Sequence, residues 1–115
     1  MPTVLIVEDE PNVRRLYEME LEREGFHVES VASGEQCLAC LEQTNPDLVV
    51  LDVMMPGMDG IETLQQLRTR KRSVRVVLNT ACTACSSNYL SWAADEFLIK
   101  SSDTSELIKT VKRLA

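Results

Sequence analysis

The alternation of short apolar runs with segments of helical periodicity is the feature that most constrains the fold of this chain. Residues 3–7 (TVLIV) and 47–51 (DLVVL) are almost continuously aliphatic, as expected for strands that are buried on both faces of a sheet. Residues 27–32 (HVESVA) alternate and predict an edge strand, and two further strands are expected at 74–78 and 96–99. Strands that alternate with helices in this way predict a parallel α/β sheet.

Helix signals separate the predicted strands. Pro11 suits the first turn of a helix that Gly25 ends. Capping-box pairs precede the second and the last helix, and they are Ser33 with Gln36 and Asp103 with Glu106. The residues expected on the buried faces of the first and last helices are Val13, Leu16, Tyr17, Leu21, Leu107, Ile108, Val111 and Leu114. Residues 85–95 are rich in serine, so we expect the fourth helix to be short or irregular.

Length, charge and hydropathy limit the classes of protein that this chain can belong to. We expect one domain over residues 1–115, a doubly wound (βα)5 fold, because 115 residues suffice for a single hydrophobic core. The net charge of −6 argues against nucleic-acid binding, and the basic run at 68–72 suits a helix C-terminus. No stretch approaches the ~20 apolar residues of a membrane span. The N-terminus turns acidic and is no secretory signal, so we expect a cytoplasmic protein without membrane contact.

Ionisable and hydroxyl side chains stand where the predicted strands end. Glu8 and Asp9 follow the first strand, Asp52 follows the third, Thr80 the fourth and Lys100 the fifth. Because the carboxyl ends of parallel strands meet at one edge of a sheet, we expect these side chains to lie together. Each alone has a plainer explanation, such as a helix N-terminal charge or a surface cation. Their joint occurrence at strand ends favours a site.

The chemistry of such a site follows from its charges. Carboxylates packed together repel, and one of them would have its pKa raised unless a cation were present. Mg²⁺ prefers oxygen ligands and is typically held by one or two carboxylates together with phosphate oxygens. A remaining carboxylate can attack phosphorus and form an acyl phosphate, while a lysine and a hydroxyl group neutralise the developing charge. The sequence therefore predicts a magnesium-dependent phosphoryl-transfer site.

Four short motifs carry a resemblance to a known family. They are VEDEP at 7–11, LDVMMPGMDG at 51–60, NTA at 79–81 and EFLIK at 96–100. Over its whole length the chain resembles the receiver domain of bacterial two-component response regulators, the CheY-like family. The second motif is the most specific, because its Asp, Met, Pro and Gly keep the family spacing. The resemblance implies a flavodoxin-like fold with the strand order 2-1-3-4-5.

The resemblance also implies roles for the acidic residues. Asp52 looks like the phosphoacceptor, the residue that accepts the phosphoryl group, and it would also bind the ion. Asp9 looks like a direct Mg²⁺ ligand, whereas Glu8 would act on the ion through water. The backbone carbonyl of Met54 would complete the protein's share of the metal shell.

The remaining family positions imply a switch. Lys100 would pair with the phosphoryl group, and Thr80 would move to form a hydrogen bond with it. Phe97 occupies the place of an aromatic side chain that turns inward when Thr80 moves, and the small Ala81 would leave the site accessible. Such a switch is a two-state element biased by a new dianion. The face around the fourth helix, fifth strand and fifth helix would then change shape.

Partners follow from the same resemblance. The phosphoryl donor would be a sensor histidine kinase or a phosphotransfer protein. An effector domain, a downstream protein or a second copy of the chain in a homodimer would read the changed face. The chain would assist its own phosphorylation and dephosphorylation without being a turnover enzyme. The sequence leaves open the kinase, the stimulus, the output, and whether the chain acts alone or within a longer regulator.

The chain also departs from the family pattern. Ser101 stands where the family usually has a proline that is joined to the conserved lysine by a cis peptide bond. Because a cis bond before a non-proline residue costs ~2.5–4 kcal/mol, we expect the Lys100–Ser101 bond to be trans or visibly strained. Residues 80–100 also form a shorter segment than usual, which puts the usual output face in question.

Two Cys-x-x-Cys pairs suggest other chemistries. Cys37 and Cys40 lie on the predicted second helix, where free cysteines pack as small hydrophobic residues. A zinc site would need four thiolates in one tetrahedron, yet the third helix is expected between this pair and Cys82 with Cys85. The alternative function is a dithiol redox protein that uses Cys82 and Cys85. A receiver fold that signals without phosphate is a third hypothesis.

Two apolar side chains are expected to tune the lifetime of the phosphoryl group. Met54 lies two residues after Asp52, and Cys82 lies two residues after Thr80. In the family, side chains at these places influence the access of water to the acyl phosphate. Neither methionine nor cysteine orients water well, so we expect a comparatively long-lived phosphoryl group.

Overall fold

Five parallel strands form one sheet in the order β2-β1-β3-β4-β5. The computed structural model describes residues 2–53, 57, 60–70, 73–81, 94–101 and 103–115. The strands are β1 (Thr3–Val7), β2 (His27–Val31), β3 (Leu48–Leu51), β4 (Arg75–Thr80) and β5 (Glu96–Ile99). The helices are α1 (Pro11–Arg23), α2 (Gly34–Gln43), α3 (Gly60–Arg70) and α4 (Ser105–Leu114). The α/β class and the strand order are confirmed, while the helix expected between β4 and β5 falls largely outside the described residues.

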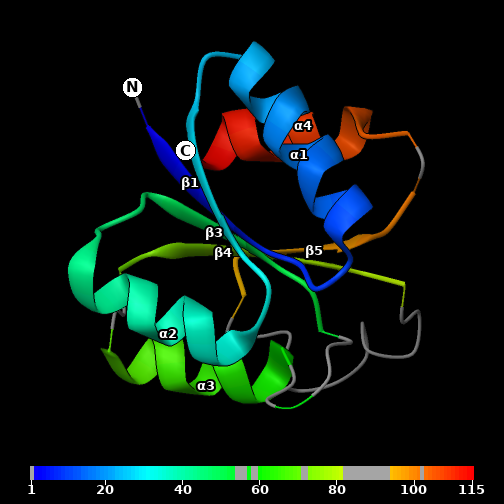
Figure 1. Ribbon diagram of the computed structural model, residues 1–115. Coiled ribbons are helices and arrows are strands. Elements are labelled where there is room, and N and C mark those ends of the chain that lie inside the picture. The colour runs from blue at the N-terminus through cyan, green and yellow to red at the C-terminus, as the bar shows by residue number, and fades with distance from the viewer. Residues whose placement is uncertain (1, 54–56, 58–59, 71–72, 82–93, 102) are drawn as a thin grey trace.

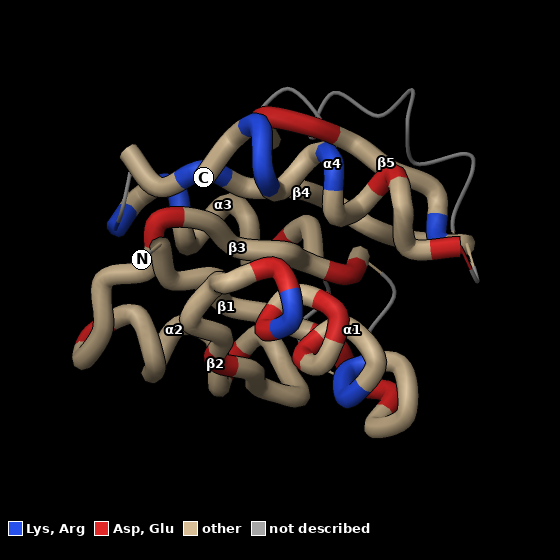
Figure 2. The backbone as a smooth tube through the Cα atoms, turned by 90° about the horizontal axis from the view of Figure 1, so that it is seen from above, with Lys and Arg blue, Asp and Glu red and all other residues tan. Residues whose placement is uncertain are grey.

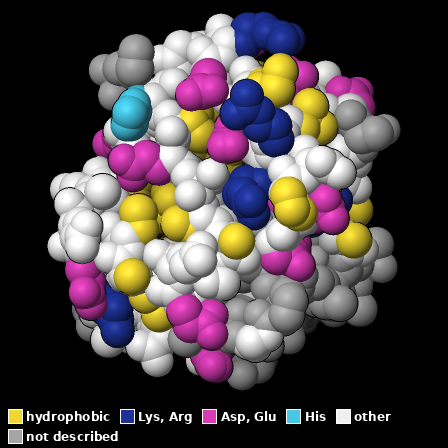
Figure 3. Space-filling view, viewed as in Figure 1, with side chains coloured by type: hydrophobic (Ala, Val, Ile, Leu, Met, Phe, Trp, Pro, Cys, Tyr) yellow, Lys and Arg dark blue, Asp and Glu magenta, His cyan; other side chains and the backbone are white. Residues whose placement is uncertain are grey.

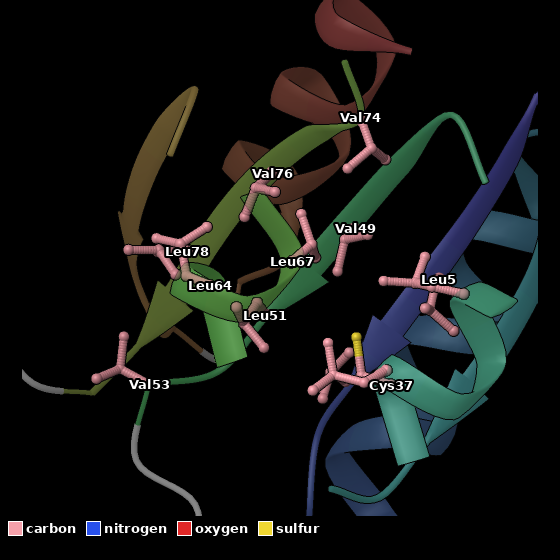
Figure 4. Packing of buried hydrophobic residues seen from close by; sticks show 13 residues of the cluster. Leu5, Cys37, Val49, Leu51, Val53, Leu64, Leu67, Val74, Val76 and Leu78 are labelled. Carbon is pink, nitrogen blue, oxygen red and sulfur yellow. The ribbon is translucent and has the colours of Figure 1, made fainter. Parts of the chain in front are cut away.

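Helices cover both faces of the sheet. Figure 1 shows α1 and α4 on one face and α2 and α3 on the other. Alternate residues of each central strand therefore enter two separate cores. Leu5, Val49 and Val76 pack with α2 and α3, as Figure 4 shows, whereas Val4 and Val50 belong to the cluster beneath α1 and α4. This double burial explains why β1 and β3 are continuously apolar.

Strand register brings the strand ends into one row. Val7 of β1 pairs with Leu51 of β3, and Leu51 pairs with Leu78 of β4. The residues that follow these positions consequently meet at one edge of the sheet. Figure 2 shows that β1 and β3 run uncharged through the molecule, while charged positions are common on the helices.

The helix boundaries confirm most of the predicted signals. Pro11 stands at the start of α1, and Gly25 follows that helix with a φ of 96°. The Ser33 side chain accepts a hydrogen bond from the Gln36 backbone N–H at 3.1 Å. The Gln36 side chain accepts from the N–H of Ala32 rather than from that of Ser33. The Ser33 half of the predicted capping box is therefore present.

Three boundary or burial predictions were wrong. Helix α4 begins at Ser105, because the Asp103 carboxylate forms a local turn by accepting from the Ser105 N–H at 2.9 Å instead of capping the helix directly. Strand β4 extends through Thr80, since the strand pairs with β5 as far as Ile99. Leu16 is 39% exposed, because the buried stripe of α1 is centred on Tyr17 and Leu21.

The surface is mixed rather than dominated by one kind of side chain. Figure 3 shows small hydrophobic patches among charged and polar groups, with the chain's one histidine, His27, on this face. His27 is exposed. Among the described residues, no helix has the length and apolar character that crossing a membrane requires.

Candidate functional site

Four charged side chains from three strand ends form one cluster. Carboxylate oxygens of Glu8, Asp9 and Asp52 lie within 4.8 Å of one another. The Lys100 ammonium Nζ lies 2.6 Å from Glu8 Oε1 and 2.9 Å from Asp52 Oδ2. The structure thus brings together the acidic residues and the lysine that the sequence predicted to meet.

Backbone hydrogen bonds hold these residues in place. The parallel ladder continues one residue beyond each strand, so that the Glu8 N–H donates to Val31 O and the Asp52 N–H donates to Val7 O, both at 3.1 Å. The Lys100 N–H donates to Thr80 O at 2.8 Å. The site is therefore built on the rigid edge of the sheet, where its side chains are oriented in advance.

Burial dominates the electrostatics of Glu8. Its residue is 1% exposed, and this burial raises the pKa of the Glu8 carboxyl group. The hydrogen bond from Lys100 opposes the rise, and the nearby charge of Asp52 adds to it. The raised pKa that the sequence predicted for one clustered carboxylate is present, but its largest cause is desolvation and not repulsion.

Lys100 stays positively charged in this setting. Burial alone would lower the pKa of its ammonium group, yet the hydrogen bonds to Glu8 and Asp52 outweigh burial and raise that pKa. A protonated lysine is therefore held against the Asp52 carboxylate. This cation would remain available to a dianionic group that formed on the same carboxylate.

The donor set fits a hard divalent cation. Three carboxylates and one ammonium group leave a formal charge of −2 at the cluster, and all the anionic donors are oxygens. Mg²⁺ prefers such oxygen ligands at short range and retains several waters. Glu8, Asp9 and Asp52 are the side chains that could hold it, whereas Met54 lies outside the described residues.

Gly60 forms part of the site because the backbone of α3 approaches Asp52 closely. A Cβ atom at Gly60 would lie 2.2 Å from the Asp52 carbonyl oxygen and 2.5 Å from the Val53 Cα. The Gly60 N–H also donates to Val53 O at 2.9 Å. The sequence identified Gly60 as part of a family motif, but the steric reason appears only in three dimensions.

The predicted switch residues lie on neighbouring strands. Thr80 is fully buried at the end of β4, and Phe97 of β5 is partly buried against the cluster beneath α2 and α3. Phe97 pairs with Leu78, and Ile99 pairs with Thr80. Since residues two apart in a strand share a face, Thr80 and Phe97 lie on the same face of the sheet. Their roles in switching stay predictions.

Several contacts at the site were not anticipated from the sequence. The Glu10 side chain caps α1 by accepting from the Asn12 N–H at 3.0 Å, and Arg14 Nη1 donates to the Glu8 carbonyl at 2.9 Å. Tyr17 had been expected only as a core residue, yet its hydroxyl accepts a hydrogen bond from Asn79 Nδ2 at 2.8 Å. A buried tyrosine needs a polar partner, and that requirement is the signal that could have revealed this pair.

The other predictions have mixed outcomes. Among the described residues no peptide bond is cis, so the Lys100–Ser101 bond is trans, as predicted. Cys37 is buried in the core and Cys40 packs against it, as the packing interpretation requires. Burial raises the pKa of the Cys37 thiol to about 12. Cys82 and Cys85 lie outside the described residues, so the tuning role expected of Cys82 stays a prediction.

Comparison with protein families gives one match that spans nearly the whole chain. The model of the response regulator receiver domain matches residues 4–112. Two transcriptional regulatory proteins are similar in sequence: ResD of Bacillus subtilis is 34% identical over 96% of this chain, and PhoB of Rhizobium meliloti is 35% identical over 99% of it. The chain covers 47% and 52% of those two proteins, about half of their length.

Solved structures show the same likeness. The response regulator TrrA from Thermotoga maritima, in complex with Mg²⁺ and beryllofluoride, has a TM-score of 0.96 and 40% identity, with full coverage of both chains. A complex of the histidine kinase ThkA with TrrA has a TM-score of 0.92 and 40% identity, covering 99% of this chain and 98% of the other.

Proposed function

Because the chain belongs to the response regulator receiver domain family, we propose that its acidic cluster is a phosphorylation site at which Asp52 accepts a phosphoryl group. The chain is a receiver domain of two-component signalling and not a dithiol redox protein. The observation that carries the proposal is the contact of the Lys100 ammonium with Asp52, at 2.9 Å, inside a cluster of three carboxylates.

Phosphoryl transfer at this site requires a nucleophile and charge neutralisation. A carboxylate oxygen of Asp52 attacks the phosphorus of the donor. The bond from phosphorus to the donor nitrogen breaks, and its electron pair leaves with the imidazole. Lys100 then neutralises the new phosphoryl oxygens, since its ammonium already contacts the carboxylate that carries them. When bound to Glu8, Asp9 and Asp52, Mg²⁺ would supply further charge neutralisation.

The signal would leave the site through β4 and β5. The buried Thr80 hydroxyl would move toward the phosphoryl oxygens, and Phe97 on the same face of the sheet would take up the vacated space. The exchange would bias one of two packings of the adjoining surface. The chain would act in this way as a switch and not as a turnover enzyme.

The partners belong to the same proposal. A complex of the neighbour TrrA with a histidine kinase supports a histidine kinase as the phosphoryl donor, with a phosphotransfer protein as the other candidate. Relatives that are transcriptional regulatory proteins support an effector as the reader of the switch. We place this chain in the cytoplasm, as one domain over residues 1–115, with a homodimer as a further form of the phosphorylated state.

The test is phosphorylation of the isolated chain. Incubation with Mg²⁺ and acetyl phosphate is expected to add the mass of one phosphoryl group and to change the fluorescence of Trp92, the one tryptophan of the chain. The Asp52→Ala variant is expected to show neither change, because it lacks the nucleophile. Intact-mass spectrometry and fluorescence titration measure the two effects.

A matched control uses a carboxylate outside the cluster. Asp47 accepts a hydrogen bond from the Thr3 N–H at the opposite ends of the strands, so Asp47→Asn should phosphorylate like the wild type. A wild-type chain that gains no mass with Mg²⁺ and acetyl phosphate would contradict the proposal and favour a receiver fold that signals without phosphate. A gain that persists in Asp52→Ala would place the acceptor elsewhere.

A further inference from the structure

A buried hydrogen bond joins α1 to the end of β4. Tyr17 and Asn79 are each 4% exposed, and Asn79 Nδ2 donates to the Tyr17 hydroxyl at 2.8 Å. Burial raises the pKa of the Tyr17 hydroxyl, so this group stays neutral at physiological pH. The phosphoryl-transfer chemistry described above uses neither side chain.

Asn79 lies beside a residue of the proposed switch. Asn79 directly precedes Thr80, and successive side chains of a strand point to opposite faces. Asn79 pairs with Leu98, which packs against the cluster beneath α1 and α4, whereas Thr80 shares the opposite face with Leu78. The end of β4 is thus held from one face by Tyr17 and presents the Thr80 hydroxyl on the other.

A cavity beside the bond gives the strand end room to move. It has a volume of about 130 Å³, and its walls include Tyr17, Asn79, Leu98 and Ser101. Close-packed interiors resist displacement, whereas a cavity leaves its lining side chains fewer contacts to lose. Ser101 follows Lys100, so the cavity also adjoins the chain segment that carries the lysine.

We propose that the Tyr17–Asn79 hydrogen bond is a latch that holds the end of β4 in the resting arrangement, the one in which Lys100 contacts the Asp52 carboxylate itself. This inference rests on the proposed function, in which Thr80 moves toward the phosphoryl group. A shift of Thr80 also moves its neighbour Asn79, and a hydrogen bond of 2.8 Å weakens once it lengthens past about 3.2 Å. Tyr17 is therefore a positioning residue, and its loss favours the switched arrangement.

The test is the affinity for beryllofluoride in the presence of Mg²⁺, measured by calorimetry. Tyr17→Phe is expected to bind beryllofluoride about two- to tenfold more tightly than the wild type, the range that one hydrogen bond contributes. The Tyr17→Phe/Asn79→Leu double variant should show the same increase as Tyr17→Phe and no more, because both variants lack the same bond. Affinity for Mg²⁺ alone should not change in any variant.

A matched control breaks another hydrogen bond between α1 and the sheet. Ser30 Oγ of β2 donates to Glu18 Oε2 at 3.0 Å. Glu18 follows Tyr17 in α1, but β2 lies at the opposite edge of the sheet from β5 and is separated from β4 by two strands. Ser30→Ala should bind beryllofluoride like the wild type. Urea unfolding measures the loss of stability of each variant separately from its binding. If Tyr17→Phe folds poorly, the double variant replaces it in the test, because it removes both partners of the hydrogen bond and leaves neither one buried without a partner.

The outcomes separate the two proposals. Equal or weaker beryllofluoride binding by Tyr17→Phe and by the double variant, with normal binding by the wild type, would overturn the latch alone. An equal increase in Ser30→Ala would also overturn it, because loosening α1 in general would then explain the effect. A wild-type chain that does not bind beryllofluoride would instead refute the phosphorylation site.

Discussion

At the scale of single residues, Gly60 is the position where a methyl group should cost most. Alanine normally favours a helix over glycine by about 1 kcal/mol. Here the added Cβ would lie 2.2 Å from the Asp52 carbonyl oxygen, a backbone atom that cannot rotate away. We expect Gly60→Ala to lower the free energy of unfolding by about 1–3 kcal/mol and to weaken beryllofluoride binding, since the loop that carries Asp52 must shift.

Gly25→Ala provides the control for this prediction. Gly25 has a φ of 96°, and an added Cβ would have no atom within 4 Å, so alanine there meets backbone strain but no neighbour. We expect a stability loss of about 1 kcal/mol with unchanged beryllofluoride affinity. Urea unfolding and calorimetric titration measure the two quantities, and equal binding by Gly60→Ala and the wild type would show that the close approach does not position Asp52.

Cys37 makes stability depend on pH in the alkaline range. The pKa of its buried thiol is raised from 9.0 to about 12. Between these values the unfolded chain loses the thiol proton and the folded chain keeps it, so unfolding releases a proton and stability falls as pH rises. The stability that comes from keeping the Cys37 thiol protonated is fully present below pH 9. Above pH 9 the free energy of unfolding falls by up to about 1.4 kcal/mol per pH unit.

The Cys37→Ala variant isolates this effect. It loses packing and should be less stable than the wild type at about pH 8, but it lacks the thiol whose proton is released. The gap in unfolding free energy between the two proteins should therefore narrow as pH is raised to about 10. Urea unfolding at several pH values measures the gap. If the free energies of unfolding of the two proteins ran parallel as a function of pH, the Cys37 thiol would lose its proton as readily in the native state as in the unfolded state.

At the scale of elements, Asp95 joins a helix to two strands. Its Oδ2 accepts from the Val76 N–H of β4 at 2.8 Å and from Arg68 Nη2 of α3 at 3.0 Å, just before β5 begins. Both charged side chains are less than one third exposed. We expect Asp95→Ala to lower the unfolding free energy by about 1–3 kcal/mol, because a strand N–H and a guanidinium group both lose their hydrogen bond to the Asp95 carboxylate.

A second ion pair on the same helix is the control. Arg70 and Glu42 link α3 to α2 at 3.4 Å, with side chains 43% and 69% exposed. Arg70→Ala should change stability by no more than about 0.5 kcal/mol, because solvent screens exposed pairs. Equal losses in Asp95→Ala and Arg70→Ala in urea unfolding would mean that the contact to β4 contributes nothing beyond a surface pair.

The elements themselves could be predicted well from the sequence where burial determines them. The strands at 3–7 and 96–99 were found at their true bounds, because an apolar run ends where the polar strand end begins. The end of β4 was missed because Asn79 and Thr80 are polar, and polar residues usually mark the end of a buried strand. Both are nevertheless buried, and Asn79 forms a hydrogen bond with Tyr17. Residues 103–105 were misassigned because a local turn competes with direct capping.

At the scale of the whole molecule, the location of the site could be predicted but its inner contacts could not. Parallel strands place their carboxyl ends together, which is why Glu8, Asp52 and Lys100 were expected to meet. The strand order came from the resemblance alone, because periodicity carries no information on which strands are neighbours. The contact of Lys100 with Glu8, at 2.6 Å, depends on rotamers and on the exact register, which no local pattern specifies.

The spread of the site along the chain has a consequence for protein quality in the cell. Lys100 and Asp52 are 48 residues apart in sequence, and their contact exists once β5 has joined β4 at one end of the sheet. A nascent chain that still lacks β5, or a molecule in which β5 has detached, does not hold Lys100 against Asp52. If Asp52 is phosphorylated as proposed, we expect signalling competence to be restricted to molecules that have completed folding, with misfolded copies silent rather than wrongly active.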